Sequence, residues 1–323
     1  MQNVLVTGGA GFIGSNFIKL LLEKNKSVQV KNFDKLTYAG RKESLAEVEQ
    51  NPRYSFIHKD ICDKKAVEEA MQGIDTVFNF AAESHVDKSI ENAHEFVQTN
   101  VFGTFTLLEA ARKNNVENFV QVSTDEVYGS IAKGKATEKS PLNPSNPYSA
   151  SKASADLLAL SYFKTHGLPV KISRSSNNFG PNQFPEKLIP FFITQIMEGK
   201  KVPVYGSGKN SRDWLFVKDN CQGIMLVGEK GKNGEVYNIG GGNEVKNIGL
   251  TKKILRLFGK TSKEIEFVKD RPGHDFRYAL DFAKIKKLGF KPSKNFDKNL
   301  KETIDWYKEN EAWWKPMKNN KVS

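Results

Sequence analysis

The chain has 323 residues, of which 38% are hydrophobic and 27% charged, and this composition is typical of a globular protein and argues against disorder. No apolar stretch approaches the roughly 20 residues that a membrane-spanning helix needs, and the first residues lack the pattern of a signal peptide, so we expect a cytoplasmic protein without a membrane partner. The net charge of +12 comes from scattered lysines interrupted by acidic residues, which speaks against nucleic-acid binding.

The cysteines and histidines predict neither a disulfide framework nor a metal site. Cys62 and Cys221 are far apart in the sequence and form no CxxC pair. The five histidines show no metal-ligand spacing. We therefore expect buried structural thiols and no bound metal.

The first half of the chain alternates short β-branched runs with helical stretches. The runs are continuously apolar, as expected of parallel strands buried on both faces. This rhythm predicts an α/β fold with a Rossmann-like, doubly wound parallel sheet. The expected strands are residues 4–6, 28–33, 54–57, 76–80 and 119–122, and the expected helices are residues 12–24, 64–71 and about 93–113.

The rhythm breaks after about residue 175, where prolines and glycines punctuate shorter elements. We assign residues 1–175 to an NAD-binding domain and residues 176–323 mainly to a smaller, mixed α/β lobe that binds the substrate. The division is not strict, because residues 170–173 are expected to return to the sheet together with some later segments.

A glycine-rich turn follows the first strand and opens the first helix. Gly8, Gly11 and Gly14 have the spacing GxxGxxG, which lets backbone N–H groups approach a pyrophosphate at the positive end of the helix. Asp34 lies about 20 residues beyond the last glycine, the distance at which a carboxylate meets the adenosine ribose. A carboxylate at this place favours NAD over NADP, although Lys35 and Arg41 lie close by in the sequence.

The ends of two later strands are expected to complete the cofactor site. Asp60 and Ile61 would lie beside the adenine. Phe80, Ala81 and Ala82 end the fourth strand, where small residues leave room for a ligand at the carboxyl edge of the sheet.

Tyr148 and Lys152 are the candidate acid/base pair. Their spacing of four residues places both on one face of a helix. A nearby ammonium lowers the pKa of a phenol from about 10, so the phenolate becomes a usable base. Thr124, at the end of the fifth strand, strengthens this interpretation.

Asp125 and Glu126 directly follow Thr124. Paired carboxyl groups of this kind can divide the two proton transfers that the elimination of water requires.

Several longer motifs give the chain a family resemblance. It resembles the extended short-chain dehydrogenase/reductases, and within them the dTDP-glucose 4,6-dehydratases, from the first strand to at least Tyr278. The motifs are TGGAGFIGSNF at residues 7–17, AAESHVD at 81–87, STDEVYG at 123–129, SNNFGP at 176–181, QFPEKLIP at 183–190 and DRPGHD at 270–275.

The resemblance implies an NAD-dependent lyase. Tyr148 would take the proton of the sugar 4′-hydroxyl while C4′ gives its hydride to NAD, and Thr124 would hydrogen-bond the 4′-oxygen. Glu126 would remove the C5′ proton while Asp125 protonates the departing 6′-hydroxyl. The hydride would then return to C6′, so NAD is regenerated in each cycle and is expected to stay tightly bound. A homodimer through the helices near residues 93–113 and 148–166 is the family's expectation.

The resemblance also assigns binding residues. The expected NAD contacts are Gly8, Gly11, Phe12, Ile13, Gly14, Asp34, Lys35, Leu36, Thr37, Asp60, Ile61, Phe80, Ala81, Ala82, Ser84, Thr99, Tyr148, Lys152 and Asn178. The expected contacts to dTDP-glucose are Ser84, His85, Thr124, Asn177, Lys187, Leu188, Pro203, Val204, Tyr205, Arg212, Asn247, Arg271 and His274.

The chain departs from the family pattern in four places, one of which is the short loop between Gly129 and Tyr148. Arg41-Lys42 stands where the family usually has Asn-Leu, Asn220 where it tends to have His, and Phe179 where it has Tyr.

Two rival functions remain. One rival is an enzyme of the same family that acts on a UDP-sugar, as a 4,6-dehydratase, 4-epimerase or decarboxylase. The other is a non-catalytic NAD-binding scaffold, which the complete catalytic constellation disfavours.

Overall fold

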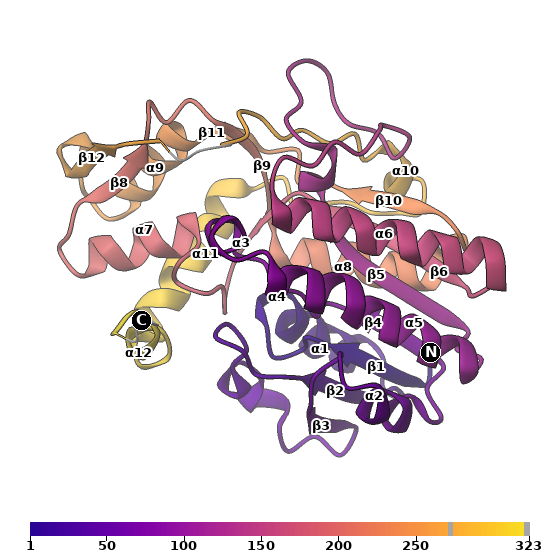
Figure 1. Cartoon of the computed structure of the whole chain (residues 1–323). Helices are drawn as coiled ribbons and strands as arrows, with labels where there is room; N and C mark the ends of the chain where they lie inside the picture. Colours follow the sequence, from indigo (N-terminus) through magenta and orange to yellow (C-terminus); the bar gives the residue numbers. More distant parts are fainter. Residues whose placement is uncertain (271–273, 320–323) are drawn as a thin grey trace.

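The structure is a computed structural model that describes residues 1–270 and 274–319. A parallel sheet lies at its centre (Figure 1), and among the described residues its strands run in the order β10-β6-β5-β4-β1-β2-β3. Every neighbouring pair is parallel, which confirms the predicted doubly wound sheet. The strands are β1 (Asn3–Thr7), β2 (Gln29–Asp34), β3 (Tyr54–His58), β4 (Thr76–Asn79), β5 (Asn118–Thr124), β6 (Val170–Ser175) and β10 (Val236–Ile239).

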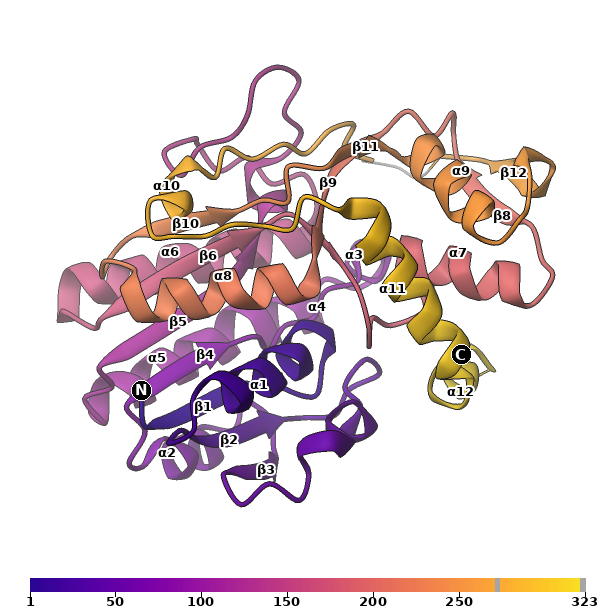
Figure 2. The ribbon, with the colours of Figure 1, turned by 180° about the vertical axis from the view of Figure 1, so that it is seen from behind.

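Helices cover both faces of the sheet. α1 and α8 pack together on the face toward the viewer in Figure 2, and α2, α5 and α6 cover the other face. Successive side chains of a strand point to opposite faces, so Val4 and Val6 join the core beneath α1 and α8, whereas Leu5 joins the core beneath α5. These helices are α1 (Phe12–Lys24), α2 (Lys64–Met71), α5 (Thr104–Lys113), α6 (Pro147–His166) and α8 (Val217–Lys230).

The helix expected at residues 93–113 is continuous but not uniform. It begins as α4 (His94–Phe96), widens into the π-helical η2 (Val97–Gly103) and continues as α5. A π-helical turn places its side chains differently from an α-helical turn and often marks a functional site. Here η2 carries Thr99 to the lining of the predicted cofactor site.

Two segments from the second half of the chain complete the sheet layer. α8 packs against β5 and β6, and β10 pairs with β6 in a register that sets Val236 beside Ile172. The expected return of residues 170–173 is confirmed as β6.

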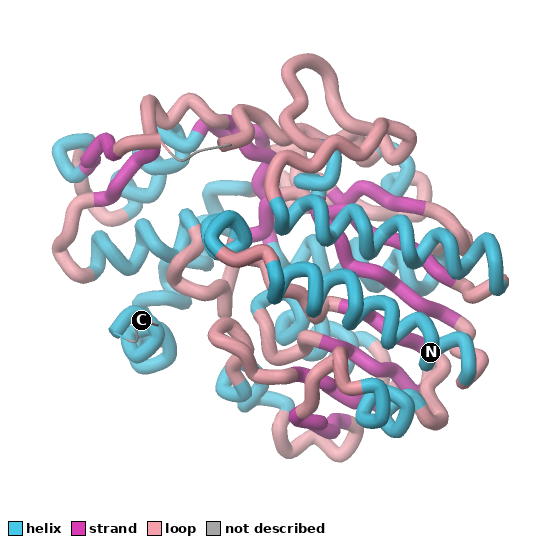
Figure 3. The backbone as a smooth tube through the Cα atoms, viewed as in Figure 1, coloured by secondary structure: helices cyan, strands magenta, loops and turns pink. Residues whose placement is uncertain are grey.

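The other elements of the second half form a smaller mixed lobe beside the carboxyl edge of the sheet (Figures 1 and 3). Its core contains Phe179, Trp214, Leu250, Tyr307 and Trp314. One small sheet has the order β11-β9-β7, and β12 pairs with β8. The lobe's elements are β7 (Asn177–Phe179), α7 (Leu188–Met197), β8 (Val202–Tyr205), β9 (Ser211–Phe216), β11 (Glu244–Lys246), α9 (Asn247–Leu257), η4 (Ser262–Glu264), β12 (Ile265–Val268), α11 (Phe296–Glu309) and α12 (Glu311–Asn319).

Short helices fill the connections between these layers. The connecting elements are η1 (Lys42–Val48), α3 (Val86–Glu91), η3 (Asp125–Tyr128) and α10 (Ala283–Lys286).

Within the part of the chain that the structure describes, no helix is long and apolar enough to cross a membrane.

Candidate active site

The carboxyl ends of the strands and the loops after them line a deep cavity between the sheet and the smaller lobe. Doubly wound sheets bind ligands in this place, where the strand order reverses beside β1. The residues expected to contact NAD that line the cavity are Gly8, Gly11, Phe12, Ile13, Gly14, Asp34, Lys35, Thr37, Asp60, Ile61, Phe80, Ala81, Ala82, Ser84, Thr99, Tyr148 and Lys152.

The glycine turn fits a pyrophosphate closely. Gly8 has φ +68°, and a Cβ there would collide with the backbone of Ala81. A Cβ at Gly14 would collide with the Gly8 carbonyl oxygen. Gly11 is the N-cap residue of α1 and carries no capping side chain, so the first N–H groups of the helix remain available to an anion in the cavity. These residues fit NAD.

Asp34 joins the glycine turn to the loop after β2. Its Oδ2 accepts a hydrogen bond from the Ala10 N–H (2.9 Å), and its Oδ1 accepts one from the Leu36 N–H (2.7 Å). Each carboxylate oxygen has two lone pairs, so Asp34 can also accept from ribose hydroxyls. Burial raises its pKa, and the two amides oppose that effect. Two expected NAD contacts, Leu36 and Asn178, are not among the residues that line the main cavity. Leu36 has φ +54° and lines a second cavity, and the Asn178 side chain donates to the Ser176 carbonyl oxygen.

The start of α6 holds Tyr148 and Lys152 in place. Asn146 caps the helix through a capping box with Ser149, and Pro147 occupies its first turn. Lys152 Nζ donates a 2.7 Å hydrogen bond to the Val122 carbonyl oxygen. Burial lowers the pKa of Lys152 to about 8.

The pKa of Tyr148 moves opposite to the direction that the sequence predicted. Burial is the main cause of the rise, the negative charge of Glu126 adds to it, and a hydrogen bond with the Thr124 side chain opposes it. Tyr148 is 9% exposed where it lines the cavity, and Lys152 donates its hydrogen bond to a backbone carbonyl oxygen. The spacing of the two residues could not reveal how strongly burial disfavours the charged phenolate.

Asp125 is in the environment of a carboxylic acid that keeps its proton. It is buried in the first turn of η3, and Oδ2 has no hydrogen-bond partner among the described residues. Its pKa is raised well above the usual value by burial, with the charges of Glu126 and Asp213 adding to the effect. Thr124 Oγ1 lies 3.4 Å from Asp125 Oδ1 and also accepts the Glu126 N–H at 3.2 Å.

Glu126 differs from its neighbour in exposure and surroundings. It is half-buried, and its Oε2 lies 3.5 Å from the Tyr278 hydroxyl. The same hydroxyl donates a 2.6 Å hydrogen bond to Asp275 Oδ2. Adjacent carboxyl groups in unlike environments can act as acid and base in one reaction.

Three loops are connected at the mouth of the cavity. Glu186 accepts a hydrogen bond from the Tyr38 hydroxyl (3.2 Å), and its other oxygen lies 3.4 Å from His85 Nε2. Lys187 Nζ donates to the Ser84 carbonyl oxygen (2.9 Å). Burial lowers the pKa of His85 despite Glu186, so the neutral imidazole is favoured. Sequence reasoning missed Tyr38 and Glu186, although both stand beside residues that it selected.

Arg212 is buried in the smaller lobe, where its charge acts on Asp125. It donates hydrogen bonds to the Ser211 and Asp275 carbonyl oxygens (both 2.8 Å), and its guanidinium lies 4.2 Å from the centre of the Tyr278 ring. Its charge opposes the rise in the pKa of Asp125. Arg212, an expected contact to dTDP-glucose, is therefore held in place by hydrogen bonds from its side chain to backbone carbonyl oxygens.

The other expected substrate contacts lie along the same lobe. Tyr205 is half-exposed at the end of β8 and packs edge-on against His274, whose Nδ1 lies 2.7 Å from Asp270 Oδ1. Asn247 begins α9, with Oδ1 buried and unpartnered among the described residues. Leu188 begins α7, Asn177 begins β7, and Pro203 and Val204 lie on β8. Arg271 lies outside the described residues.

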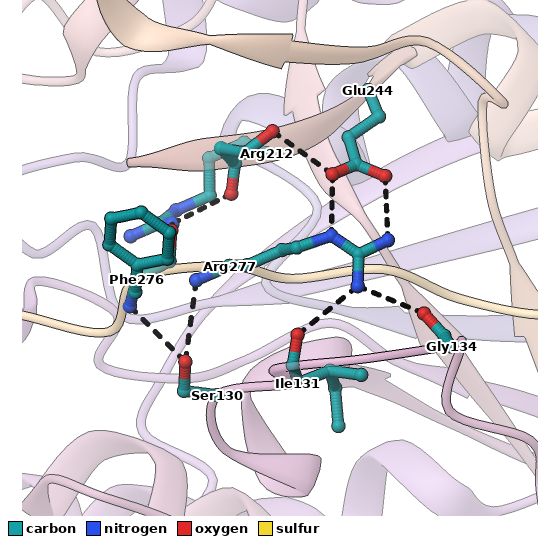
Figure 4. A network of polar contacts seen from close by, with 8 residues as sticks. Ser130, Ile131, Gly134, Arg212, Glu244, Phe276 and Arg277 are labelled. Carbon is teal, nitrogen blue, oxygen red and sulfur yellow. Dashed lines mark hydrogen bonds and ion pairs between the residues drawn. The ribbon is translucent and has the colours of Figure 1, made fainter. Parts of the chain in front are cut away.

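Figure 4 shows how Phe276 and Arg277 are held by the loop after η3 and by Glu244. Arg277 forms a two-pronged ion pair with Glu244 (2.6 and 2.9 Å) and donates to the carbonyl oxygens of Ile131 and Gly134. Ser130 Oγ accepts the backbone N–H groups of Phe276 and Arg277. The loop after η3 and the smaller lobe thus fix this segment from both sides.

The comparisons with known proteins agree with this geometry. A family model described as GDP-mannose 4,6 dehydratase matches residues 5–303. A dTDP-glucose 4,6-dehydratase of Streptomyces niveus is 50% identical over 322 residues, covering 98% of this chain and 96% of that protein.

Solved structures extend the similarity to the whole fold. The crystal structure of the dTDP-glucose 4,6-dehydratase DesIV of Streptomyces venezuelae with NAD bound matches with a TM-score of 0.95 and 49% identity, covering 98% of this chain and 99% of that one. The UDP-glucose 4-epimerase of Thermus thermophilus in complex with NAD matches with a TM-score of 0.88 and 29% identity, covering 95% and 99%.

Proposed function

This chain belongs to the family that the GDP-mannose 4,6 dehydratase model describes, and on that premise we infer that it converts dTDP-glucose to dTDP-4-keto-6-deoxyglucose and water, with NAD as its cofactor. The observation that carries this function is the contrast within the Asp125–Glu126 pair. One carboxyl group is buried with a raised pKa, and its neighbour is half-buried beside a hydroxyl.

The proton transfers are divided among three side chains. Tyr148 accepts the proton of the 4′-hydroxyl, and the Thr124 hydroxyl holds the 4′-oxygen in place. Glu126 removes the C5′ proton, which the neighbouring ketone has made acidic, and returns it to C5′ when the hydride reaches C6′. Asp125, kept protonated by its burial, gives its proton to the departing 6′-hydroxyl.

The cofactor supplies the redox part of the reaction. When NAD is bound, it takes the hydride from C4′ and returns it to C6′. The glycine turn and the N-terminus of α1 would hold its pyrophosphate, and Asp34 would accept hydrogen bonds from the adenosine ribose. Lys152 lies one helical turn beyond Tyr148 on α6, and its hydrogen bond to the Val122 carbonyl oxygen fixes its position.

A UDP-sugar 4-epimerase is the nearest alternative. Epimerisation needs one acid/base beside the cofactor, whereas this site has a second, buried carboxylic acid at Asp125. The relatives also differ in similarity: identity to the dTDP-glucose 4,6-dehydratase structure is 49%, against 29% for the UDP-glucose 4-epimerase structure. Both observations favour dehydration of a dTDP-sugar.

A single incubation tests the function. Purified protein is mixed with dTDP-glucose deuterated at C4′, without added reductant, and the product is examined by NMR. We expect a 4-keto-6-deoxy sugar with the deuterium at C6′. Formation of dTDP-galactose alone would contradict dehydration. In a parallel incubation, faster turnover of UDP-glucose than of dTDP-glucose would contradict the proposed preference for the dTDP-sugar.

We also propose that the chain forms a homodimer through the helices on one face of the sheet. Large apolar side chains are exposed there, in η2, α5 and α6, at Val97 (53%), Phe102 (45%), Phe105 (41%) and Leu157 (58%). Contiguous exposed apolar surface of this kind is typical of subunit interfaces. A second copy of the chain would cover it.

We place the enzyme in the cytoplasm, because nucleotide sugars and NAD are made and used there. Both cysteines carry free thiols, which suits a reducing compartment. Fractionation of source cells, with a secreted protein as the reference, tests this location. Recovery of the activity from the extracellular fraction would contradict it.

A further inference from the structure

A second cavity adjoins the cofactor cavity, and the function proposed above does not use it. Its volume is about 490 Å³, within the range of about 300–1,000 Å³ that is usual for small-molecule sites. Both cavities are lined by Thr37, Tyr38, Gly40 and Phe184. These residues therefore form the wall between the two cavities.

Two aromatic rings make up most of this wall. Tyr38, in the loop after β2, and Phe184, between β7 and α7, pack edge to face with their ring centres 5.3 Å apart. The Tyr38 hydroxyl donates a 3.2 Å hydrogen bond to Glu186 Oε1, and Lys88 Nζ lies 3.7 Å from the centre of the Tyr38 ring. The wall is thus built from side chains of two segments that lie far apart in the sequence.

The segment between β7 and α7 also covers the glycine turn. The Asn16 side chain on α1 donates to the Pro181 carbonyl oxygen (3.0 Å), and Lys187 Nζ donates to the Ser84 carbonyl oxygen (2.9 Å). Tyr38 reaches the same segment from the loop after β2. These anchors belong to α1 and to the loops after β2 and β4, the two strands beside β1. A pyrophosphate at the turn is therefore enclosed by this segment.

The second cavity opens to solvent and carries positive charge. Lys42 and Glu43 are exposed in its lining, and Arg41 is half-buried. Arg41 Nε lies 3.4 Å from Glu43 Oε2, whereas the Lys42 ammonium lies over the Phe56 ring, 4.6 Å from its centre. Arg41 and Lys42 are two residues at which the chain departs from the family pattern. Cations at the mouth of a cleft raise the local concentration of an anion such as a dinucleotide.

We propose that NAD enters and leaves through the second cavity, and that the wall of Tyr38 and Phe184 is the gate to the cofactor cavity. The inference rests on NAD as the cofactor of the proposed function and is independent of the sugar. Lys42 attracts the pyrophosphate, and the Tyr38 ring turns away from Phe184 with the loss of its hydrogen bond to Glu186. The bonds that close the gate join protein groups, so weakening them lowers the same barrier in both directions.

Tyr38→Phe keeps the ring and removes the hydrogen bond that closes the gate. The holoenzyme is loaded with radiolabelled NAD, release is followed after addition of excess unlabelled NAD, and the Kd is measured by equilibrium dialysis. We expect release to become about fivefold faster, as the loss of one hydrogen bond implies, while the Kd changes by less than about twofold. The rate of entry, obtained from the release rate and the Kd, should therefore rise with the rate of release.

Variants of the acceptor separate the gate from general packing. Glu186→Leu removes the acceptor and should speed release as Tyr38→Phe does. Glu186→Gln keeps an oxygen that can accept from the Tyr38 hydroxyl, so release should stay close to that of the unaltered chain. Tyr162→Phe is the matched control, because its hydroxyl bonds the Glu109 carboxylate (2.8 Å) away from both cavities, and release should not change.

Lys42→Gln tests the entrance. We expect entry of NAD to slow by about twofold to threefold at low ionic strength and to equal that of the unaltered chain at about 0.5 M salt, where the charge is screened. Release should be unaffected, because Lys42 lies outside the gate. Lys263→Gln, an exposed lysine of η4 in the smaller lobe, removes the same charge elsewhere and is the control.

Each outcome decides one part of the proposal. Unchanged release in both Tyr38→Phe and Glu186→Leu overturns the gate. Faster release with a Kd raised by the same factor also overturns it, because Tyr38 would then be an ordinary contact of bound NAD. Entry that is insensitive to Lys42→Gln at low salt overturns the entrance. Failure of the unaltered chain to bind NAD would instead contradict the proposed function, which the incubation with dTDP-glucose tests separately.

Discussion

Arg174 and Asp156 form a 2.8 Å ion pair in the interior of the protein, and Asp156 lies one helical turn beyond Lys152 on the same face of α6. Tyr148, Lys152 and Asp156 therefore form one line along the helix. The negative charge of Asp156 opposes the fall in the pKa of Lys152 that burial causes. The ion pair fixes Asp156 on the helix that carries the proposed acid/base pair, Tyr148 and Lys152.

Asp156→Asn should strongly destabilise the fold. Both side chains of the pair are at least 96% buried, so the variant leaves the Arg174 guanidinium charged in the interior with its carboxylate partner gone. We expect a loss of about 3–5 kcal/mol in the free energy of unfolding, measured by urea denaturation. Asp305→Asn, which breaks the exposed Lys301–Asp305 pair, is the control and should leave the midpoint unchanged.

Lys152→Met should change how the stability of the NAD-free protein depends on pH. The pKa of Lys152 is lowered from 10.5 to about 8, so between these values the unfolded chain binds the proton and the folded chain does not. Wild-type stability then rises with pH across this window, relative to the variant, by about 3 kcal/mol at roughly 1.4 kcal/mol per pH unit. A constant difference between the two unfolding curves from pH about 8 to 10.5 would mean that the ammonium is not buried.

Glu126→Gln should separate oxidation from elimination. The amide cannot accept the C5′ proton, so we expect kcat to fall by about 10²–10⁴-fold, while bound NADH still forms slowly and is detected by its absorbance. Asp125→Asn should also accumulate bound NADH, because the amide cannot protonate the leaving hydroxyl. Normal turnover by Glu126→Gln would refute the assignment of the base.

Gly14→Ala should abolish tight retention of NAD. The added methyl group would collide with the Gly8 carbonyl oxygen, a backbone atom that cannot move without displacing the turn. The measurement is the NAD content of the purified protein and the Kd for added NAD. Gly249→Ala is the matched control: its Cβ would meet only Val245 at an ordinary distance of 3.6 Å, so NAD binding should be preserved.

Phe105→Asp should prevent dimer formation. A carboxylate at this exposed ring of α5 would have to be desolvated beneath a second copy of the chain. Sedimentation velocity should show a dimer for the unaltered chain and a monomer for the variant. Phe267→Asp, at a still more exposed ring (61% against 41%) on the distant β12, should stay dimeric.

The sequence predicted the sheet well because its signals are local. The bounds of α1 and α2 agree with the expected helices, since apolar periodicity defines both. It could not predict that β10 pairs with β6, because a contact between residues more than 60 positions apart leaves no periodic trace.

The candidate site was predictable as far as motifs extend. Most expected NAD contacts line one cavity, whereas Glu186 and Tyr38 join it through loop packing that no motif states. The raised pKa of Tyr148 depends on how much water surrounds the phenol. That quantity is a property of the folded surroundings, which a spacing of four residues does not contain.

The late position of β10 has a consequence for synthesis on the ribosome. Until residues 236–239 have emerged, the edge of β6 exposes a row of backbone groups that another chain could pair with. By that stage the nascent polypeptide already includes α7, β8 and β9 of the smaller lobe. The last strand of the parallel sheet is therefore translated after much of the smaller lobe. The nascent chain cannot complete its central sheet first and must protect an aggregation-prone edge in the meantime.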